Sequence, residues 1–193
     1  MHDFLSHTGN LILFPRAALR NLLADPRRLA FGFCGILTLS VLYIIAISIA
    51  LARNPTTLPL VFPVLNIPTE KYYAYERLFL LPVAVASVIL HSGVVRLIAK
   101  PLGGKGKFED LIALLGFAYV LIALTMGLPD LVIAVSGWQV TAVGPHVVIG
   151  TVWFFILSLL AVKETEDLSW GLTALAALAG FLANASVQFV FMR

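Results

Sequence analysis

The chain has 193 residues, of which 60% are hydrophobic and only 12% are charged, and its mean hydropathy is +0.98. Soluble domains carry about 25% charged and about 45–50% apolar residues. This composition therefore excludes an ordinary water-soluble fold and indicates a protein whose apolar surface is covered by lipid. The net charge of +3 does not indicate nucleic-acid binding, because the basic residues stand at the ends of apolar segments, where they are typical headgroup anchors.

Residues 1–28 precede the long apolar runs and are expected to form a cytoplasmic N-terminal segment. Residues 14–23 predict a short amphipathic helix with Pro15 at its first position. Arg16 and Arg20 share one face. The apolar face carries four residues, Ala18, Leu19, Leu22 and Leu23. We interpret this element as an interfacial helix on an anionic leaflet; the alternative is a basic helix that packs against the rest of the protein.

Five apolar runs follow, each close to the about 20 residues that cross a hydrocarbon core of about 30 Å. They cover residues 29–52, 78–99, 111–128, 145–162 and 170–192. Residues 131–135 are also apolar, and either extend the third run or lie in the interface. The pattern predicts an all-α polytopic membrane helix bundle, with a five-helix transmembrane domain over residues 29–193.

The distribution of basic residues predicts an orientation. With the N-terminus in the cytoplasm, nine Lys and Arg residues fall on the cytoplasmic side and four on the other side. The positive-inside rule favours this arrangement, and five spans then place the C-terminus outside.

The connection at residues 53–77 contains four prolines, which argue against a continuous helix. We expect it to lie extended over the outer surface, with Tyr72, Tyr73 and Tyr75 at headgroup depth.

A second connection, KPLGGKGKFED at residues 100–110, is glycine-rich and basic. It fits neither the phosphate-binding P-loop spacing nor a dinucleotide fingerprint, so it predicts a tight, positively charged turn. An acidic cluster at residues 164–167 lies on the same side of the predicted bundle; it either pairs with this turn or presents a polar face to a partner. Our candidates for contact with lipids or a partner are Arg16, Arg20, Arg27, Arg28, Lys100, Lys105 and Lys107.

Two features inside the spans are polar. His91 is the histidine deepest in a span, and we interpret it as a hydrogen-bonded packing residue, with a proton, metal or ligand role as the alternative. In the last span, small and polar residues recur at four-residue intervals. They are Ala176, Gly180, Asn184 and Gln188. This stripe predicts a helix-packing face; the alternative is that its amides line a polar cavity.

No nucleophile and base can be paired from the sequence, and no two histidines share ligand spacing on one helix. We therefore predict a non-enzymatic protein without cofactor or metal. An intramembrane enzyme using His91 or His146 is a further alternative.

Three segments resemble the Ypt-interacting protein family, whose shared region is the YIP domain. They are LFPRAALRNLLADPRRLAFGF at 13–33, GGKGKFEDLIALLGFAYV at 103–120 and VWFFILSLLAVKETEDLSWGLTAL at 152–175. The resemblance implies a five-helix membrane domain with its N-terminus inside. The short N-terminal segment is similar to that of prokaryotic members, which implies a bacterial inner membrane.

Eukaryotic members of that family act in early secretory traffic and bind prenylated Rab-type GTPases. No residue set here matches a GTPase-binding motif, so that role is not transferred to this chain. Our leading hypothesis is a membrane scaffold or adaptor that binds lipids, another membrane protein or a second copy of itself. The alternative is a small transporter or channel with a polar path past His91, Asn184 and Gln188.

Overall fold

The computed structural model describes residues 2–53, 67–68, 71–136 and 144–191, and these residues form helices and short connections without any strand. Five helical segments in this part of the chain are long and apolar enough to cross a membrane. They are α3 (Arg28–Arg53), α4 (Tyr72–Ala99) with the 3₁₀ turn η2 (Lys100–Leu102), the run from α5 (Phe108–Ile122) to α6 (Leu128–Ser136), α7 (Pro145–Glu166) and α8 (Trp170–Phe191). The predicted all-α bundle is confirmed.

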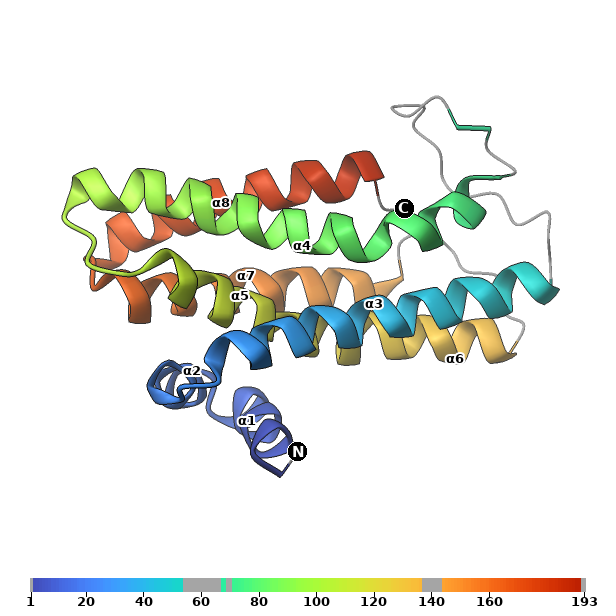
Figure 1. Cartoon of the computed structure of the whole chain (residues 1–193), viewed down its shortest axis with the longest axis horizontal. Helices are drawn as coiled ribbons and strands as arrows, with labels where there is room; N and C mark the ends of the chain where they lie inside the picture. The colour runs from blue at the N-terminus through green and yellow to red at the C-terminus, as the bar shows by residue number, and fades with distance from the viewer. Residues whose placement is uncertain (1, 54–66, 69–70, 137–143, 192–193) are drawn as a thin grey trace.

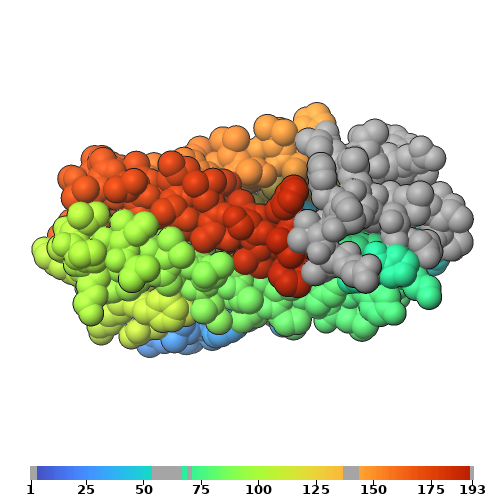
Figure 2. Space-filling view, turned by 90° about the horizontal axis from the view of Figure 1, so that it is seen from above, coloured from blue at the N-terminus to red at the C-terminus, as the bar shows by residue number. Residues whose placement is uncertain are grey.

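The long helices lie roughly along one axis (Figure 1). Helices α4 and α8 run side by side on one face, as the space-filling view also shows (Figure 2). Helices α3 and α5 form the other extensive helix pair. The central helix is α5, because between Leu111 and Ala123 every residue except Ile112 is buried.

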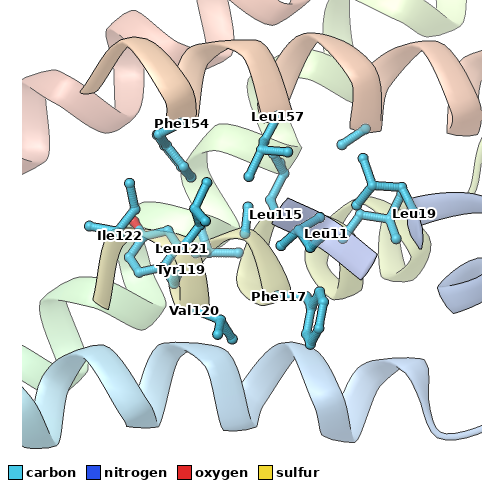
Figure 3. Packing of buried hydrophobic residues seen from close by; sticks show 14 of the residues in the cluster. Leu11, Leu19, Leu115, Phe117, Tyr119, Val120, Leu121, Ile122, Phe154 and Leu157 are labelled. Carbon is cyan, nitrogen blue, oxygen red and sulfur yellow. The ribbon is translucent and has the colours of Figure 1, made fainter. Parts of the chain in front are cut away.

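The core gathers around α5 and includes residues from the N-terminal helices. Figure 3 shows Leu115 and Phe117 of α5 among side chains from neighbouring helices. Phe154 stands edge-on to Tyr119, with ring centroids 5.3 Å apart. Leu11 and Leu19 belong to the same cluster although they precede the first span.

The third span is longer than its predicted limits of 111–128, because α5 continues through the π-helical turn η3 (Ala123–Gly127) into α6. Residues 131–135 thus extend the helix, which resolves the two alternatives left open by the sequence. Pro129 explains the irregular turn: it has no N–H to donate, and its ring would clash with the carbonyl four residues earlier in a regular α-helix. The wider turn brings Thr125 and Met126 against Gly150 of α7.

The N-terminal segment is a helical hairpin. Helix α2 (Pro15–Ala24) was expected, whereas α1 (His2–Leu13) has no counterpart in the sequence prediction. We expected the apolar face of α2 to lie on lipid, but it is buried within the protein. Three of its four residues, Ala18, Leu19 and Leu22, are at most 2% exposed. They are buried because α2 packs against α5 and α7, where burial in protein removes the same apolar area from water.

The prediction for residues 53–77 was wrong at its C-terminal end. Helix α4 begins at Tyr72, so the three tyrosines are helical and not part of an extended connection. Tyr72 is 1% exposed, and its hydroxyl donates to the carbonyl oxygen of Phe191 at 2.9 Å. Residues 54–66 and 69–70 of that connection lie outside the described residues.

Candidate functional sites: the charged end and a buried polar network

Three charged segments meet at one end of the bundle, which we call the charged end: residues 16–28, residues 96–110 and residues 163–170. Arg16 and Arg20, one turn apart on α2, both donate through Nε to the carboxylate of Glu164 at the end of α7. Arg28 donates to Asp110 at 2.6 Å, which joins the start of α3 to the start of α5. The glycine-rich turn also pairs with the acidic cluster, through Lys105 and Asp167, which is one of the two outcomes that the sequence allowed.

The deepest pair at this end is built around Glu166, which is fully buried. Arg96 Nη1 donates to its Oε2 at 2.7 Å, and the backbone N–H of Gly106 donates to the same oxygen at 3.1 Å. Its other oxygen, Oε1, has no hydrogen-bond partner among the described residues.

The two glycines of the turn make room for this carboxylate. A Cβ on Gly106 would stand 2.8 Å from Glu166 Oε1, and a Cβ on Gly104 would also meet the carboxylate. Gly103, with a φ of 89°, takes a left-handed conformation that glycine adopts without strain. The glycines therefore allow the turn to pack closely against the end of α7.

Two basic residues of the charged end, Lys100 and Lys107, are exposed, and neither has an ion-pair partner among the described residues. The same end of the bundle exposes three large apolar side chains, Leu97, Leu102 and Phe108. Trp170 is 51% exposed and carries two cations on its ring, Arg16 at 5.7 Å and Lys163 at 5.6 Å from the centroid. Exposed cations beside apolar and aromatic groups are typical of a membrane interface.

Ion pairs shift the pKa values of several charged groups near the ends of the helices. Lys105 donates to Asp167 at 3.1 Å and lowers the pKa of that carboxyl, mainly through the hydrogen bond. Arg27 lowers the pKa of Asp25 in the same way. Glu164 raises the pKa of the Arg20 guanidinium. Lys105 and Asp167 are largely in contact with solvent, so their pair contributes little to stability.

A second site lies inside the spans, where a polar network joins four helices. His91 of α4 is fully buried, and its Nε2 lies 2.8 Å from Ser158 Oγ on α7. Asn184 Nδ2 of α8 lies 3.4 Å from His91 Nδ1 and donates to the Tyr119 hydroxyl of α5 at 3.1 Å. Gln188 extends the network to Tyr119 and to Ser87.

The network fits a neutral imidazole. An amide N–H can only donate, so His91 Nδ1 accepts from Asn184, which leaves the hydrogen on Nε2 to be donated to Ser158. The four-residue stripe of α8 faces α4: Ala176, Gly180 and Asn184 are buried, and a Cβ on Gly180 would meet the His91 ring and Val95. In this conformation both ring nitrogens of His91 and the amide nitrogen of Asn184 are hydrogen-bonded to side chains of the network.

Sequence reasoning missed a pair near the opposite end. His146, at the start of α7, had no carboxylate close in sequence, yet its Nε2 lies 2.9 Å from Asp130 Oδ1 on α6. Neither side chain is more than 19% exposed. The only signal was that a short connection must return the chain from α6 to α7. Among the described residues, no group of three His, Cys, Asp or Glu side chains is arranged to hold a metal ion.

The comparisons agree with this architecture. No curated protein and no solved structure matches the chain. The family model described as the Yip1 domain matches residues 9–192 of the sequence. This range includes α2, all five long helical segments and both paired turns of the charged end. The resemblance drawn from the turn sequences is thereby confirmed, and the chain belongs to the Yip1 domain family of membrane proteins.

Proposed function

We propose that this protein is a non-enzymatic membrane scaffold or adaptor whose charged end binds anionic lipid headgroups or a protein partner. The observation that carries the proposal is that two basic residues, Lys100 and Lys107, are exposed and have no ion-pair partner among the described residues. Most carboxylates nearby already form ion pairs within the protein. Counting residues 16–28, 96–110 and 163–170, this end has nine Lys or Arg against six Asp or Glu, a net charge of +3.

The charge balance supports an anionic partner. The leaflet on the cytoplasmic side is negatively charged, and each basic residue near it contributes about 1 kcal/mol of attraction. An orientation with the N-terminus and the charged end in the cytoplasm is part of the proposal, as is residence in a bacterial inner membrane. The internal pairs hold the three segments in a fixed arrangement, which lowers the conformational entropy lost on binding.

The experiment reverses the free charges without touching an internal pair. The purified K100E/K107E variant is titrated with phosphatidylglycerol in neutral detergent, and binding is followed by native mass spectrometry. We expect an affinity weaker by at least about 30-fold, because two favourable charges are lost at about 1 kcal/mol each and two unfavourable charges take their place. Photo-cross-linking in native membranes follows protein partners in parallel.

The matched control is R53E/K71E, which reverses two exposed basic residues at the opposite end. It should leave lipid affinity and cross-links unchanged. If the K100E/K107E variant changes neither readout, the charged end is not a binding surface and the proposal is wrong.

The transporter alternative receives no specific support from the polar network. A route for a solute needs polar groups that face a water-filled path. His91 is 0% exposed and both of its ring nitrogens bond to side chains of the bundle, while Asn184 is 3% exposed and its amide nitrogen bonds to His91 and Tyr119. The network supports a role in joining helices.

A further inference from the structure

The hairpin of α1 and α2 lies beside the spans and not beyond their ends. Phe4 of α1 stands edge-on to Phe117, with ring centroids 5.5 Å apart, and it also contacts Phe31 of α3. Phe108 is the first residue of α5 and lies at the charged end. Phe117 follows it by nine residues, which places Phe117 about 13 Å along the helix from that end. One leaflet of the hydrocarbon core is about 15 Å thick. Helix α1 therefore lies at the depth of a single leaflet.

Part of the outward surface of the hairpin, on α1 and at its connection to α2, is apolar. The four large side chains at its surface are Leu5, Ile12, Leu13 and Phe14, which are 61%, 46%, 71% and 65% exposed. This surface continues onto exposed apolar residues of α3, including Leu29 and Phe33, which face lipid in any membrane-spanning arrangement. Figure 1 shows the hairpin to one side of the bundle, next to the N-terminal part of α3.

The polar groups of the hairpin have the order expected at a lipid boundary. On α1, Leu5 and Ile12 are seven residues apart and share a face, whereas the exposed Ser6 and Asn10 are four apart on the neighbouring face. An element buried completely among acyl chains would not carry that polar face, and an element in water would not expose the apolar one. Arg16 and Trp170, which are in contact, anchor α2 at the headgroups.

We propose that the α1–α2 hairpin is a lipid-embedded wedge that occupies the leaflet on the side of the charged end. Its partner is the acyl chains of that leaflet. Among the described residues no comparable element lies beside the bundle at the other end, so the described part of the chain has its larger cross-section in the leaflet of the hairpin. A larger cross-section there favours a membrane that curves with that leaflet on the outside.

This inference is independent of the proposed adaptor function. It depends on the apolar residues of the hairpin, whereas lipid headgroup binding was assigned to Lys100 and Lys107. The K100E/K107E variant should therefore keep the wedge even if it loses lipid affinity, and each proposal can fail without the other.

The first test measures depth. In a C34S background, a fluorophore is placed through L13C on the full chain in vesicles, with S169C at the charged end as the matched position. We expect the probe at residue 13 to be quenched by lipids brominated on their acyl chains and shielded from aqueous iodide. The probe at residue 169 should show the reverse. Iodide quenching of residue 13 equal to that of residue 169 overturns the proposal.

The second test measures curvature preference. Labelled protein with its charged end outward is reconstituted in giant vesicles, and a narrow membrane tether is pulled from them. Wild type should be denser on the tether than on the vesicle, and L13Q/F14Q should lose most of that enrichment. The control V148Q/I149Q alters lipid-exposed residues of α7 away from the hairpin and should keep it. Equal density of wild type on tether and vesicle overturns the wedge.

Discussion

Two helix pairs in this bundle are held together by opposite means. At the α3–α5 interface, glycines without side chains let the two backbones come close together. A Cβ on Gly32 would stand 2.7 Å from the Ala113 carbonyl oxygen, and one on Gly116 would stand 2.9 Å from the Gly32 carbonyl oxygen. At the α4–α8 interface polar side chains are present, with Asn184 bonded toward His91. Both means suit a lipid environment, where hydrophobic burial does not distinguish a neighbouring helix from lipid.

The difference determines how far each contact reaches. The glycine contact joins only two helices, α3 and α5, and consists mainly of backbone atoms. The polar contact reaches two further helices, because Ser158 and Tyr119 belong to α7 and α5. Loss of the first should separate one pair of helices, while loss of the second should loosen a four-helix arrangement by a smaller free energy.

The largest effect is expected at the glycine interface. In G35A the new methyl group would lie 3.1 Å from both Phe117 Cα and Val120 Cγ2 and still closer to the Gly116 carbonyl oxygen. Backbone atoms cannot move aside as a flexible side chain can, so we expect a loss of about 1–3 kcal/mol in the free energy of unfolding. Unfolding is measured by sodium dodecyl sulfate titration in mixed micelles. The control G93A places a methyl where no atom lies within 4 Å and should not destabilise the protein.

A smaller loss is expected in the polar network. The variant N184L keeps a side chain of similar size but removes the donor to Tyr119 and His91. A hydrogen bond inside a membrane is worth about 0.6 kcal/mol on average, so two lost bonds should cost about 1 kcal/mol in the same titration. The control S186A removes an exposed hydroxyl that bonds within its own helix. Equal stability of N184L and S186A would show that the network does not hold the four helices together.

The smallest effect should come from a charge outside the spans. Because the pKa of Asp167 is lowered in the folded protein, its contribution to stability is present above the usual value of 3.8 and is lost as the pH falls through the lower folded value. The D167N variant should therefore lose a little stability at neutral pH and none at the acidic end of this range. Asparagine suits the test because it tolerates the left-handed φ of 54° at this position. Thermal unfolding at two pH values measures the difference; an equal deficit at both would rule out the ion pair as its cause.

The features that the sequence predicted well are those with a local pattern. Apolar runs of sufficient length located the spans, and the four-residue spacing of Gly180 and Asn184 indicated the face of α8 that meets α4. Which residues bond to Asn184 could not be predicted from such a local pattern. Tyr119 and His91 lie 28 positions apart, and their connection through Asn184 exists only once three helices are packed.

Other features were missed because their local signal is weak or misleading. Helix α1 contains Gly9 and a mixed polar sequence that does not indicate a helix, and it is stabilised by the contacts of Phe4 and Leu11 with the bundle. The apolar face of α2 was visible, but amphipathicity does not distinguish burial against lipid from burial against protein. The glycines of α3 were overlooked because the small residue they meet, Gly116, lies on a different span.

The π-helical turn at Ala123–Gly127 sets the rotation of α6 relative to α5. Consecutive residues of an α-helix are rotated by about 100° around its axis. A π-helical turn accommodates one extra residue, so the helix beyond it keeps nearly the rotation that it would have without that residue. If the turn became regular α-helix with all its residues kept, everything beyond it would rotate by about 100°, and Asp130 would turn away from His146. A substitution in this turn that looks conservative in a hydropathy profile would then leave two correctly formed half-helices that no longer fit the same set of neighbours.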